Sequence, residues 1–434
     1  MQRWFYIVIL ILLMEELKMK WKMKKLSILV ITLLLLFQTA CSKSEKTNES
    51  INSGKVQTTV SITPTVTQVT ATPAEQTSKP AESQPATPVS SKTDKETKVS
   101  IKPFDDIRAF DGEKKILEEN EYSLDDMITY TFNEGTVLKG NESRQKEIMN
   151  NGKNPGLGIR KLHEEGITGK GINVAIIDQN LLLHHPEFDG KIAKYYDTGC
   201  EQDPKSGSMH APAVTSILVG STVGVAPDAK VYFAAAPSWT RDSAFFAKGL
   251  NWIIKVNKKL PKDEKIRVVS VSAAPSGDGS PFIKNQKMWD KAVLAAQKEG
   301  ILVLDCRNDK TTGIIAPAYY DPEKPDDAAM CTGGFPTSKF IIPSSKIGVP
   351  TSYRTVAEEY VEGSPSYQYT GQGGLSWGIP YAAGVLALGW QVDPSLDNEQ
   401  IVKTLFETST KAKDGISNII NPTAFIDAIK KAKE

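Results

Sequence analysis

The sequence predicts an α/β fold: a doubly wound, mostly parallel sheet with helices on both faces. Short apolar runs typical of strands buried on both faces alternate with longer helix-like stretches. The expected strands are residues 173–178, 230–235, 267–272 and 301–304. The expected helices are residues 210–219, 242–258, 282–299 and 384–391, followed by terminal helices at 397–407 and 422–433. Length agrees, since the roughly 280 residues that begin at position 154 suit one such domain.

Residues 1–41 form a predicted secretion signal. A basic Met23-Lys24-Lys25 precedes the apolar run 26–37, and the segment ends at Cys41. The run Gln38-Thr39-Ala40-Cys41 resembles a bacterial lipoprotein signal, with Cys41 as the lipidated residue that carries fatty acyl groups such as palmitate. A non-lipidated secretion signal and an uncleaved anchor are the alternatives. The earlier apolar run 4–14 is too short to span a bilayer, so Met19 and Met23 are alternative starts.

Two segments separate this signal from the folded domain. Residues 42–100 consist mainly of Ser, Thr, Pro, Lys and Glu, which cannot bury enough surface to fold, so we expect a disordered tether. Residues 101–153 contain more apolar side chains, including Phe104, Ile107 and Phe132. We expect them to form an N-terminal extension that packs on domain 154–434, with a removable pro-segment as the alternative. The expected location is the bacterial cell surface, on the outer face of the cytoplasmic membrane, or the medium after secretion.

Composition excludes several partners. The formal net charge is +1, with both signs mixed along the chain, which gives no basic footprint for nucleic acid. Besides Cys41, the cysteines are Cys200, Cys306 and Cys331, whose odd number and spacing suit no metal site. At most one disulfide can form among them, and three free buried thiols are the simpler expectation. We expect a monomer.

Three residues with catalytic chemistry occupy favourable positions. Asp178 ends the first strand run, at the sheet edge where open α/β sheets place their sites. His210 opens a helix-like apolar stretch. Ser376 precedes a helix of small residues, where free backbone N–H groups and the helix dipole favour developing negative charge. Taken alone, the serine is better explained as a helix cap.

The scarcity of histidine narrows the choice of a general base. The chain has four histidines: His163, His184, His185 and His210. His163 lies in a charged helical stretch and is expected at the surface. His184 and His185 are adjacent and point differently, and no nearby Cys or further His completes a metal ligand set, so no metal site is expected. His210 remains the candidate base.

These features together resemble the subtilisin-like serine proteases. The resemblance rests on Asp178, His210 and Ser376 in that chain order and on the turn Gly224-Val225-Ala226-Pro227. It covers the chain from about Asn154 to its end. It implies that Asp178 orients the imidazole, His210 is the general base and Ser376 attacks the peptide bond of a polypeptide substrate. It implies no required cofactor. Structural calcium occurs in such proteins, but no acidic cluster gives it an assignable site.

The flanks of the three residues depart from the family. The departures are Asp178-Gln179-Asn180, His210-Ala211-Pro212 and Ser376-Trp377-Gly378. All three chemical groups are kept, which favours a membrane-tethered endopeptidase that works through an acyl-enzyme. The alternative is a catalytically weak subtilase-fold binding or scaffold protein at the cell surface.

The resemblance also implies auxiliary residues. Asn308 follows a strand as the family's oxyanion asparagine does, so its amide is expected to pair with the Ser376 backbone N–H around the oxyanion. The run 268–274 resembles the strand whose exposed edge pairs with substrate. Ser272, Ala273 and Ala274 are the expected wall residues. Cleavage specificity and calcium dependence do not follow from the sequence.

Overall fold

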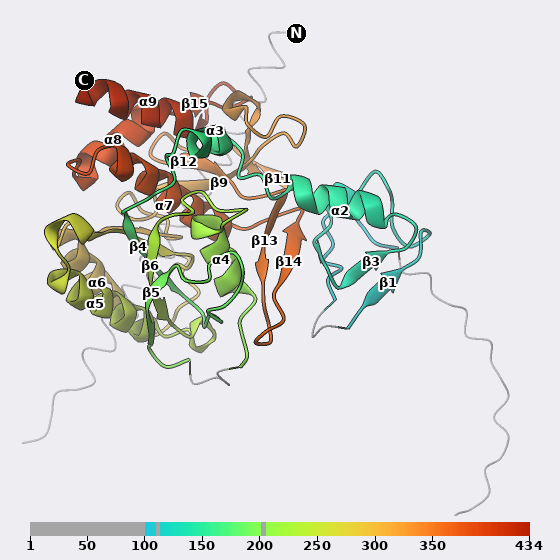
Figure 1. The fold of residues 1–434 in the computed structure, drawn as a ribbon, viewed down its shortest axis with the longest axis horizontal. Coiled ribbons are helices and arrows are strands. Elements are labelled where there is room, and N and C mark those ends of the chain that lie inside the picture. Colours follow the sequence, from blue (N-terminus) through green and yellow to red (C-terminus); the bar gives the residue numbers. More distant parts are fainter. Residues whose placement is uncertain (1–99, 110–112, 201–204) are drawn as a thin grey trace, which may run out of the picture. The chain divides into compact units, whose positions relative to one another are not determined.

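The computed structural model of this chain describes residues 100–109, 113–200 and 205–434 (Figure 1). The signal, the lipidation site at Cys41 and the tether lie among residues 1–99, outside the described residues. The described residues belong to one compact unit that spans residues 92–434. The extension 101–153 and the domain 154–434 therefore lie in the same unit.

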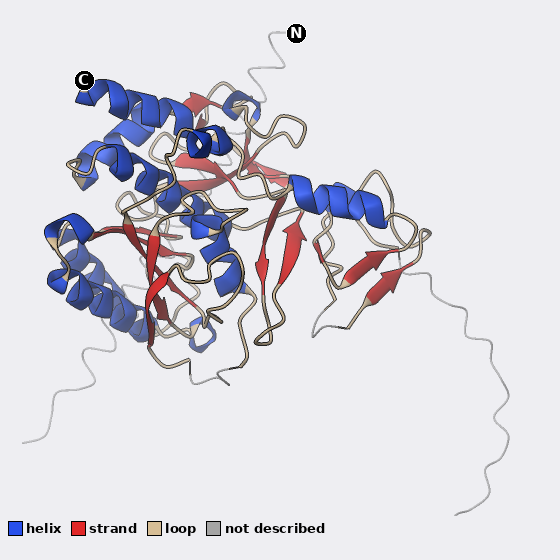
Figure 2. Cartoon of the chain, in the orientation of Figure 1, coloured by secondary structure: helices blue, strands red, loops and turns tan. Residues whose placement is uncertain are grey.

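Five parallel strands form the sheet that carries the candidate site. Their order across the sheet is β5-β6-β4-β7-β8, and every neighbouring pair is parallel. Their bounds are β4 Asn173–Asp178, β5 Ile192–Asp197, β6 Lys230–Ala235, β7 Ile266–Val271 and β8 Leu302–Asp305. Helices cover both faces of this sheet (Figure 2), which confirms the predicted fold class.

The alternation of side chains along β4 explains why its sequence is apolar throughout. Val174 and Ile176 lie in one hydrophobic cluster, which includes residues of α4 (His210–Val219) and α7 (Leu375–Val392). Ala175 and Ile177 lie in a second cluster, which includes residues of α5 (Ser243–Lys259) and α6 (Gln286–Lys298). A strand between two helical layers has no solvent-facing side, so a continuous apolar run replaces the alternation of a half-exposed strand.

Four helices make the two layers. Their bounds are α4 His210–Val219, α5 Ser243–Lys259, α6 Gln286–Lys298 and α7 Leu375–Val392. The last is longer than the predicted 384–391 because it continues through Pro380 to the first turn. Its small residues allow close packing: a Cβ added to Gly384 would lie 2.7 Å from the Cβ of Val225. The helix backbone can approach its neighbour only because that side chain is missing.

The C-terminal half adds strands that the sequence did not predict. They form a six-stranded sheet, β11-β10-β9-β12-β16-β15, and part of a three-stranded sheet, β13-β14-β2. Their bounds are β9 Ile315–Tyr319, β10 Thr332–Phe335, β11 Ser338–Lys339, β12 Ile347–Pro350, β13 Arg354–Glu358, β14 Ser366–Thr370, β15 Thr410–Lys411 and β16 Asn418–Ile419. The terminal helices are present as α8 Asn398–Glu407 and α9 Pro422–Lys433.

The N-terminal extension lies beside β13 and β14 and forms a small hydrophobic core with Tyr369 of β14 (Figure 1). Its elements are β1 Lys115–Leu117, η1 Met127–Thr129, β2 Phe132–Asn133, β3 Thr136–Leu138 and α2 Glu142–Asn151. Strand β2 pairs with β14 and so joins the extension to the following domain. The remaining short helices are α3 Ile159–Glu164, η2 Ser238–Thr240, η3 Lys262–Glu264 and η4 Ala328–Met330.

The three cysteines among the described residues form no disulfide. Cys200, Cys306 and Cys331 are all free thiols, and Cys200 and Cys331 are buried while Cys306 is half-buried. Within residues 100–109, 113–200 and 205–434, no helix combines the length and apolar character needed to cross a bilayer.

Candidate active site

The structure joins Asp178 to His210. Asp178 ends β4 and is 4% exposed. Its Oδ1 accepts one hydrogen bond from the Gln179 backbone N–H at 2.9 Å and another from His210 Nδ1 at 2.7 Å. Because a carboxylate can only accept, the Nδ1 atom carries the proton and Nε2 is left as the basic nitrogen of the neutral ring.

A serine before the helix fixes where His210 stands. His210 is the first residue of α4. The Ser208 hydroxyl accepts a hydrogen bond from the Ala211 backbone N–H at 3.1 Å and donates one to the Asn180 carbonyl at 2.9 Å. Ser208 thus satisfies a free N–H group of the first turn and ties the helix start to the residues that follow Asp178.

The carboxylate sets the protonation of the imidazole. Burial opposes a charge on His210, but the nearby charge of Asp178 and the hydrogen bond to it outweigh burial, so the pKa of His210 is raised above its usual value. The His210 side chain is 21% exposed. A raised pKa strengthens a base that takes a proton from a hydroxyl.

We therefore expect kcat/KM for a peptide substrate to rise with pH through a pKa above about 6.5, the ordinary value for histidine. Below that pKa the imidazole is protonated and cannot act as a base. The effect on stability has the opposite direction: the protonated pair stabilises the fold below the unfolded-state pKa, and this contribution is lost as pH rises through the folded-state pKa. A kcat/KM profile recorded from pH 5 to 9 tests this, and an acid limb below pH 6 would contradict it.

Ser376 lies in the first turn of α7, at the carboxyl ends of β7 and β8. Its hydroxyl donates to the Ser272 carbonyl at 3.2 Å, and the Ser272 hydroxyl donates to the Ser376 carbonyl at 2.8 Å. Burial raises the pKa of the Cys306 thiol, and the nearby Ser376 side chain opposes this shift. Within the part of the chain that the structure describes, no hydrogen bond joins Ser376 to His210. Proton transfer between them would require the Ser376 hydroxyl to leave the Ser272 carbonyl, and catalytic hydrogen bonds are often long or poorly aligned before substrate binds.

Trp377 fills the space between the helix start and the base. Its ring centroid lies 5.3 Å from that of His210. Its Nε1 donates to the Thr370 hydroxyl at 3.3 Å, and the residue is 6% exposed. The departure from the family pattern therefore places a large ring directly against the imidazole. The sequence marked this residue as unusual but gave no sign of its contact with His210.

The structure corrects the expectation of an exposed strand edge. Strand β7 pairs with β4 on one side and with β8 on the other, so its residues up to Val271 have no free edge. Beyond it, Cys306 N–H donates to the Ala273 carbonyl at 2.9 Å, and the Ser280 hydroxyl donates to the Ala274 carbonyl at 2.6 Å. Ser272 does lie beside Ser376. The carbonyls of its two neighbours each accept one hydrogen bond and can accept a second, so the assignment of Ser272, Ala273 and Ala274 as wall residues stays a prediction.

Asn308 lies in the turn after β8, with its side chain exposed. Among the described residues, no hydrogen bond holds its amide, so the group is available to an incoming ligand. The structure does not bring it into hydrogen-bonding contact with Ser376. Its assignment as an oxyanion donor stays a prediction.

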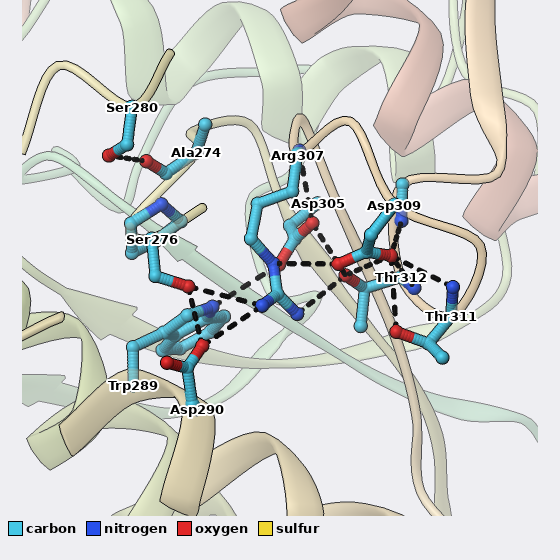
Figure 3. Close-up of polar contacts among 12 residues, drawn as sticks. Ala274, Ser276, Ser280, Trp289, Asp290, Asp305, Arg307, Asp309, Thr311 and Thr312 are labelled. Carbon is cyan, nitrogen blue, oxygen red and sulfur yellow. Dashed lines mark hydrogen bonds and ion pairs between the residues drawn. The ribbon is translucent and has the colours of Figure 1, made fainter. Parts of the chain in front are cut away.

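An ion network around the buried Asp305, which the sequence did not predict, connects the side chains of this turn (Figure 3). Arg307 Nε lies 2.8 Å from Asp305 Oδ2, its Nη1 lies 3.1 Å from Asp290 Oδ1, and its Nη2 donates to the Thr312 hydroxyl at 2.7 Å. Its Nη1 also donates to the Ser276 hydroxyl at 3.1 Å. One guanidinium thus links the segment after β7 to the turn after β8. The sequence feature that could have indicated this network is Asp305 at the end of β8, the same position that Asp178 has in β4.

The two acids at the ends of this turn have opposite pKa shifts. Burial raises the pKa of Asp305, although the charge of Arg307 opposes it. Burial also disfavours the charged form of Asp309, but the backbone N–H groups of Thr312, Gly313 and Thr311 outweigh it and hold its pKa below the usual range. The ionised Asp309 therefore fixes the far side of the turn that carries Asn308.

The other histidines have partners outside the candidate site. His163 is half-buried, and its Nε2 lies 2.8 Å from the Val225 carbonyl, so the expectation of a surface residue was wrong. His185 is fully buried and its Nε2 lies 3.0 Å from the Ser366 carbonyl. His184 is exposed beside Asp189. The part of the chain that the structure describes contains no group of three His, Cys, Asp or Glu residues that could hold a metal.

The fold and the site together are those of an α/β protein with an Asp, His, Ser order of candidate catalytic groups. The chain belongs to the subtilase family (peptidase S8), whose profile matches residues 169–420, more than half of its length. It is 26% identical over 256 residues to M-protease of Shouchella clausii (strain KSM-K16), covering 57% of this chain and 61% of the relative. It is 25% identical over 256 residues to subtilisin Savinase of Lederbergia lenta, covering 57% of this chain and 87% of that protein. The match therefore spans less than two thirds of M-protease.

Solved structures of similar fold include a protease of Pseudoalteromonas arctica PAMC 21717. It has a TM-score of 0.47 and 17% identity, and covers 65% of this chain and 98% of that one. A second solved structure, described as the structural basis of subtilase cytotoxin SubAB assembly, has a TM-score of 0.49 and 14% identity. The match covers 64% of this chain and 96% of the chain in that structure.

Proposed function

We propose that this protein is a serine endopeptidase that hydrolyses peptide bonds through an acyl-enzyme on Ser376. The observation that carries the proposal is the 2.7 Å hydrogen bond between Asp178 and His210 at the carboxyl edge of the parallel sheet. This bond gives the imidazole the tautomer and the raised pKa that a general base needs. The family and the position of Ser376 at the start of α7 support it.

The mechanism follows from these groups. Ser376 Oγ attacks the substrate carbonyl while His210 Nε2 takes its proton, and Asp178 stabilises the imidazolium. The imidazolium then gives the proton to the leaving amine, and the peptide bond breaks to leave an ester on Ser376. Water, deprotonated by the same imidazole, hydrolyses that ester. The chemistry requires no cofactor.

Asn308 is the proposed side-chain donor to the oxyanion, beside the backbone N–H of Ser376. In subtilisin the loss of such a donor lowers kcat roughly 10²-fold to 10³-fold. We expect Asn308→Ala to lower kcat by the same order with little change in KM, because the donor acts mainly on the transition state. Lys310→Ala, an exposed change in the same turn, is the matched control. Equal kcat values for the two variants would remove Asn308 from the mechanism.

Digestion of a library of blocked peptides tests the function as a whole. An endopeptidase cleaves internal bonds of peptides whose two ends are both blocked, and the cleaved positions give the specificity that the sequence leaves open. The same digestion with Ser376→Ala protein is the control. Folded wild-type protein that cleaves no peptide would favour the alternative of a binding or scaffold protein.

Secretion and anchoring belong to the same proposal. The basic and apolar segment before Cys41 supports export, and Cys41 is the proposed site of lipidation. Residues 42–100 would then hold the enzyme away from the membrane surface as a tether. Fractionation tests this: Cys41→Ser protein is expected in the medium and wild-type protein in the membrane fraction. Equal distribution of the two proteins would contradict lipid anchoring at Cys41.

A further inference from the structure

The N-terminal extension completes a sheet of the domain that follows it. Strand β2 pairs antiparallel with β14, with Asn133 opposite Gln368 and Phe132 opposite Tyr369. The rings of Phe132 and Tyr369 stack with their centroids 5.1 Å apart, and both residues are buried. Without the extension, β14 would be an edge strand with a large aromatic ring uncovered.

The contact continues beyond the strand toward the nucleophile. The Tyr369 hydroxyl donates to the Ile128 carbonyl at 2.9 Å, and the Gly371 N–H donates to the Tyr130 carbonyl at 3.1 Å. A Cβ added to Gly371 would lie 1.9 Å from the Thr129 carbonyl oxygen, so only glycine fits against the extension here. Gly371 precedes Ser376 by five residues.

A buried carboxylate also depends on the extension. Glu358 of β13 is 1% exposed. It accepts a hydrogen bond from Asn133 Nδ2 at 2.7 Å, and Arg108 Nη1 lies 3.6 Å from its Oε1. Burial raises the pKa of Glu358, which these partners oppose. Removal of the extension would take away both of these partners and would uncover the carboxylate, which would keep its hydrogen bonds from the Tyr360 and Ser366 hydroxyls.

A short chain of contacts leads from β14 to the base. Thr370, the last residue of β14, accepts the hydrogen bond from Trp377 Nε1. Trp377 packs against the imidazole of His210. The strand that β2 holds in place therefore determines where the indole lies, and the indole is one wall around the base.

We propose that residues 101–153 stay part of the mature enzyme and, through β14, position Trp377 against His210. This rests on the proposed function, because it assigns a positioning role for the same reaction. It decides between the two alternatives that the sequence left open for this segment: a packed extension and a removable pro-segment.

The first test determines the N-terminus of the active species. The full chain is produced with its own signal, treated with a fluorophosphonate, and the labelled protein is digested and mapped by mass spectrometry. Peptides from residues 101–153 are expected in the labelled chain. An active chain that begins near residue 153 would overturn the proposal. If no chain is labelled, the proposed function fails, while the N-terminus of the accumulated folded protein still reports whether the extension is retained.

The second test separates positioning from stability. Phe132→Leu loosens the contact with β14, whereas Phe425→Leu makes a comparable change at a buried phenylalanine of α9, against Gly389 at the far end of α7. Both variants should be less stable. Per folded molecule, only Phe132→Leu is expected to lower kcat, by about tenfold to a hundredfold with KM retained, because small displacements of catalytic groups are costly. Equal kcat values for the two variants would show that the extension only stabilises the fold.

Discussion

Replacing Ser376 with alanine is expected to lower kcat about 10⁶-fold, the order found when subtilisin loses its catalytic serine. The reason is that the acyl-enzyme cannot form, and only binding and oxyanion stabilisation remain. The measurement is kcat and KM on a peptide that the wild-type protein cleaves, with KM expected to change little. Ser338→Ala, at an exposed position of β11, is the matched control and should retain wild-type activity.

A Ser376→Ala variant that retains a tenth of the wild-type rate would contradict this account. Cys306 would then be the first residue to test, since its thiol lies near the Ser376 side chain. A thiol with a raised pKa is a poor nucleophile at neutral pH. We therefore expect that the Cys306 thiol does not replace the Ser376 hydroxyl as the nucleophile.

Asp178→Asn is expected to lower kcat about 10⁴-fold with the geometry intact, the effect known for this change in a Ser-His-Asp triad. An amide can hold the imidazole in the wrong tautomer and cannot stabilise its positive charge. The second consequence concerns pH. Because Asp178 causes the raised pKa of His210, the acid limb of the residual kcat/KM should move to lower pH. The pH profile of the purified variant measures both effects.

Asp189→Asn is the control for this change, since Asp189 is exposed and, within the part of the chain that the structure describes, its carboxylate pairs only with His184. Its activity and pH profile should match those of the wild type. If the Asp178→Asn variant kept the wild-type acid limb, the raised pKa of His210 would have another cause, and the assigned role of Asp178 would be wrong.

Strands β4, β6, β7 and β8 of the central sheet were predictable because burial on both faces leaves a continuous apolar run. Strand β5, Ile192–Asp197, was missed because its side chains are exposed or half-buried. The bounds of β4, β6 and α4 match the expected ranges residue for residue. The strands of the C-terminal half were missed because they are short, and some contain glycine or proline, as in β12, Ile347–Pro350. Such strands gain their stability from long-range pairing, which local pattern does not reveal.

The positions of the candidate catalytic residues could be predicted from the sequence, but the side-chain contacts between them and their neighbours could not. The position of Asp178 at a strand end and of His210 at a helix start followed from sequence, and the structure joins the two. The bond from the Ser376 hydroxyl to the Ser272 carbonyl depends on a side-chain rotamer, which no periodicity encodes. The same holds for the ring of Trp377 against His210 and for the ion network of Arg307. Both join residues far apart in the chain.

The most direct test of the account is to locate the fluorophosphonate adduct on the wild-type protein. Mass spectrometry of the labelled and digested protein should place a single adduct on Ser376, and Asp178→Asn should slow its formation. An adduct on Cys306 or on another serine would contradict the account, and so would the absence of any adduct on folded protein.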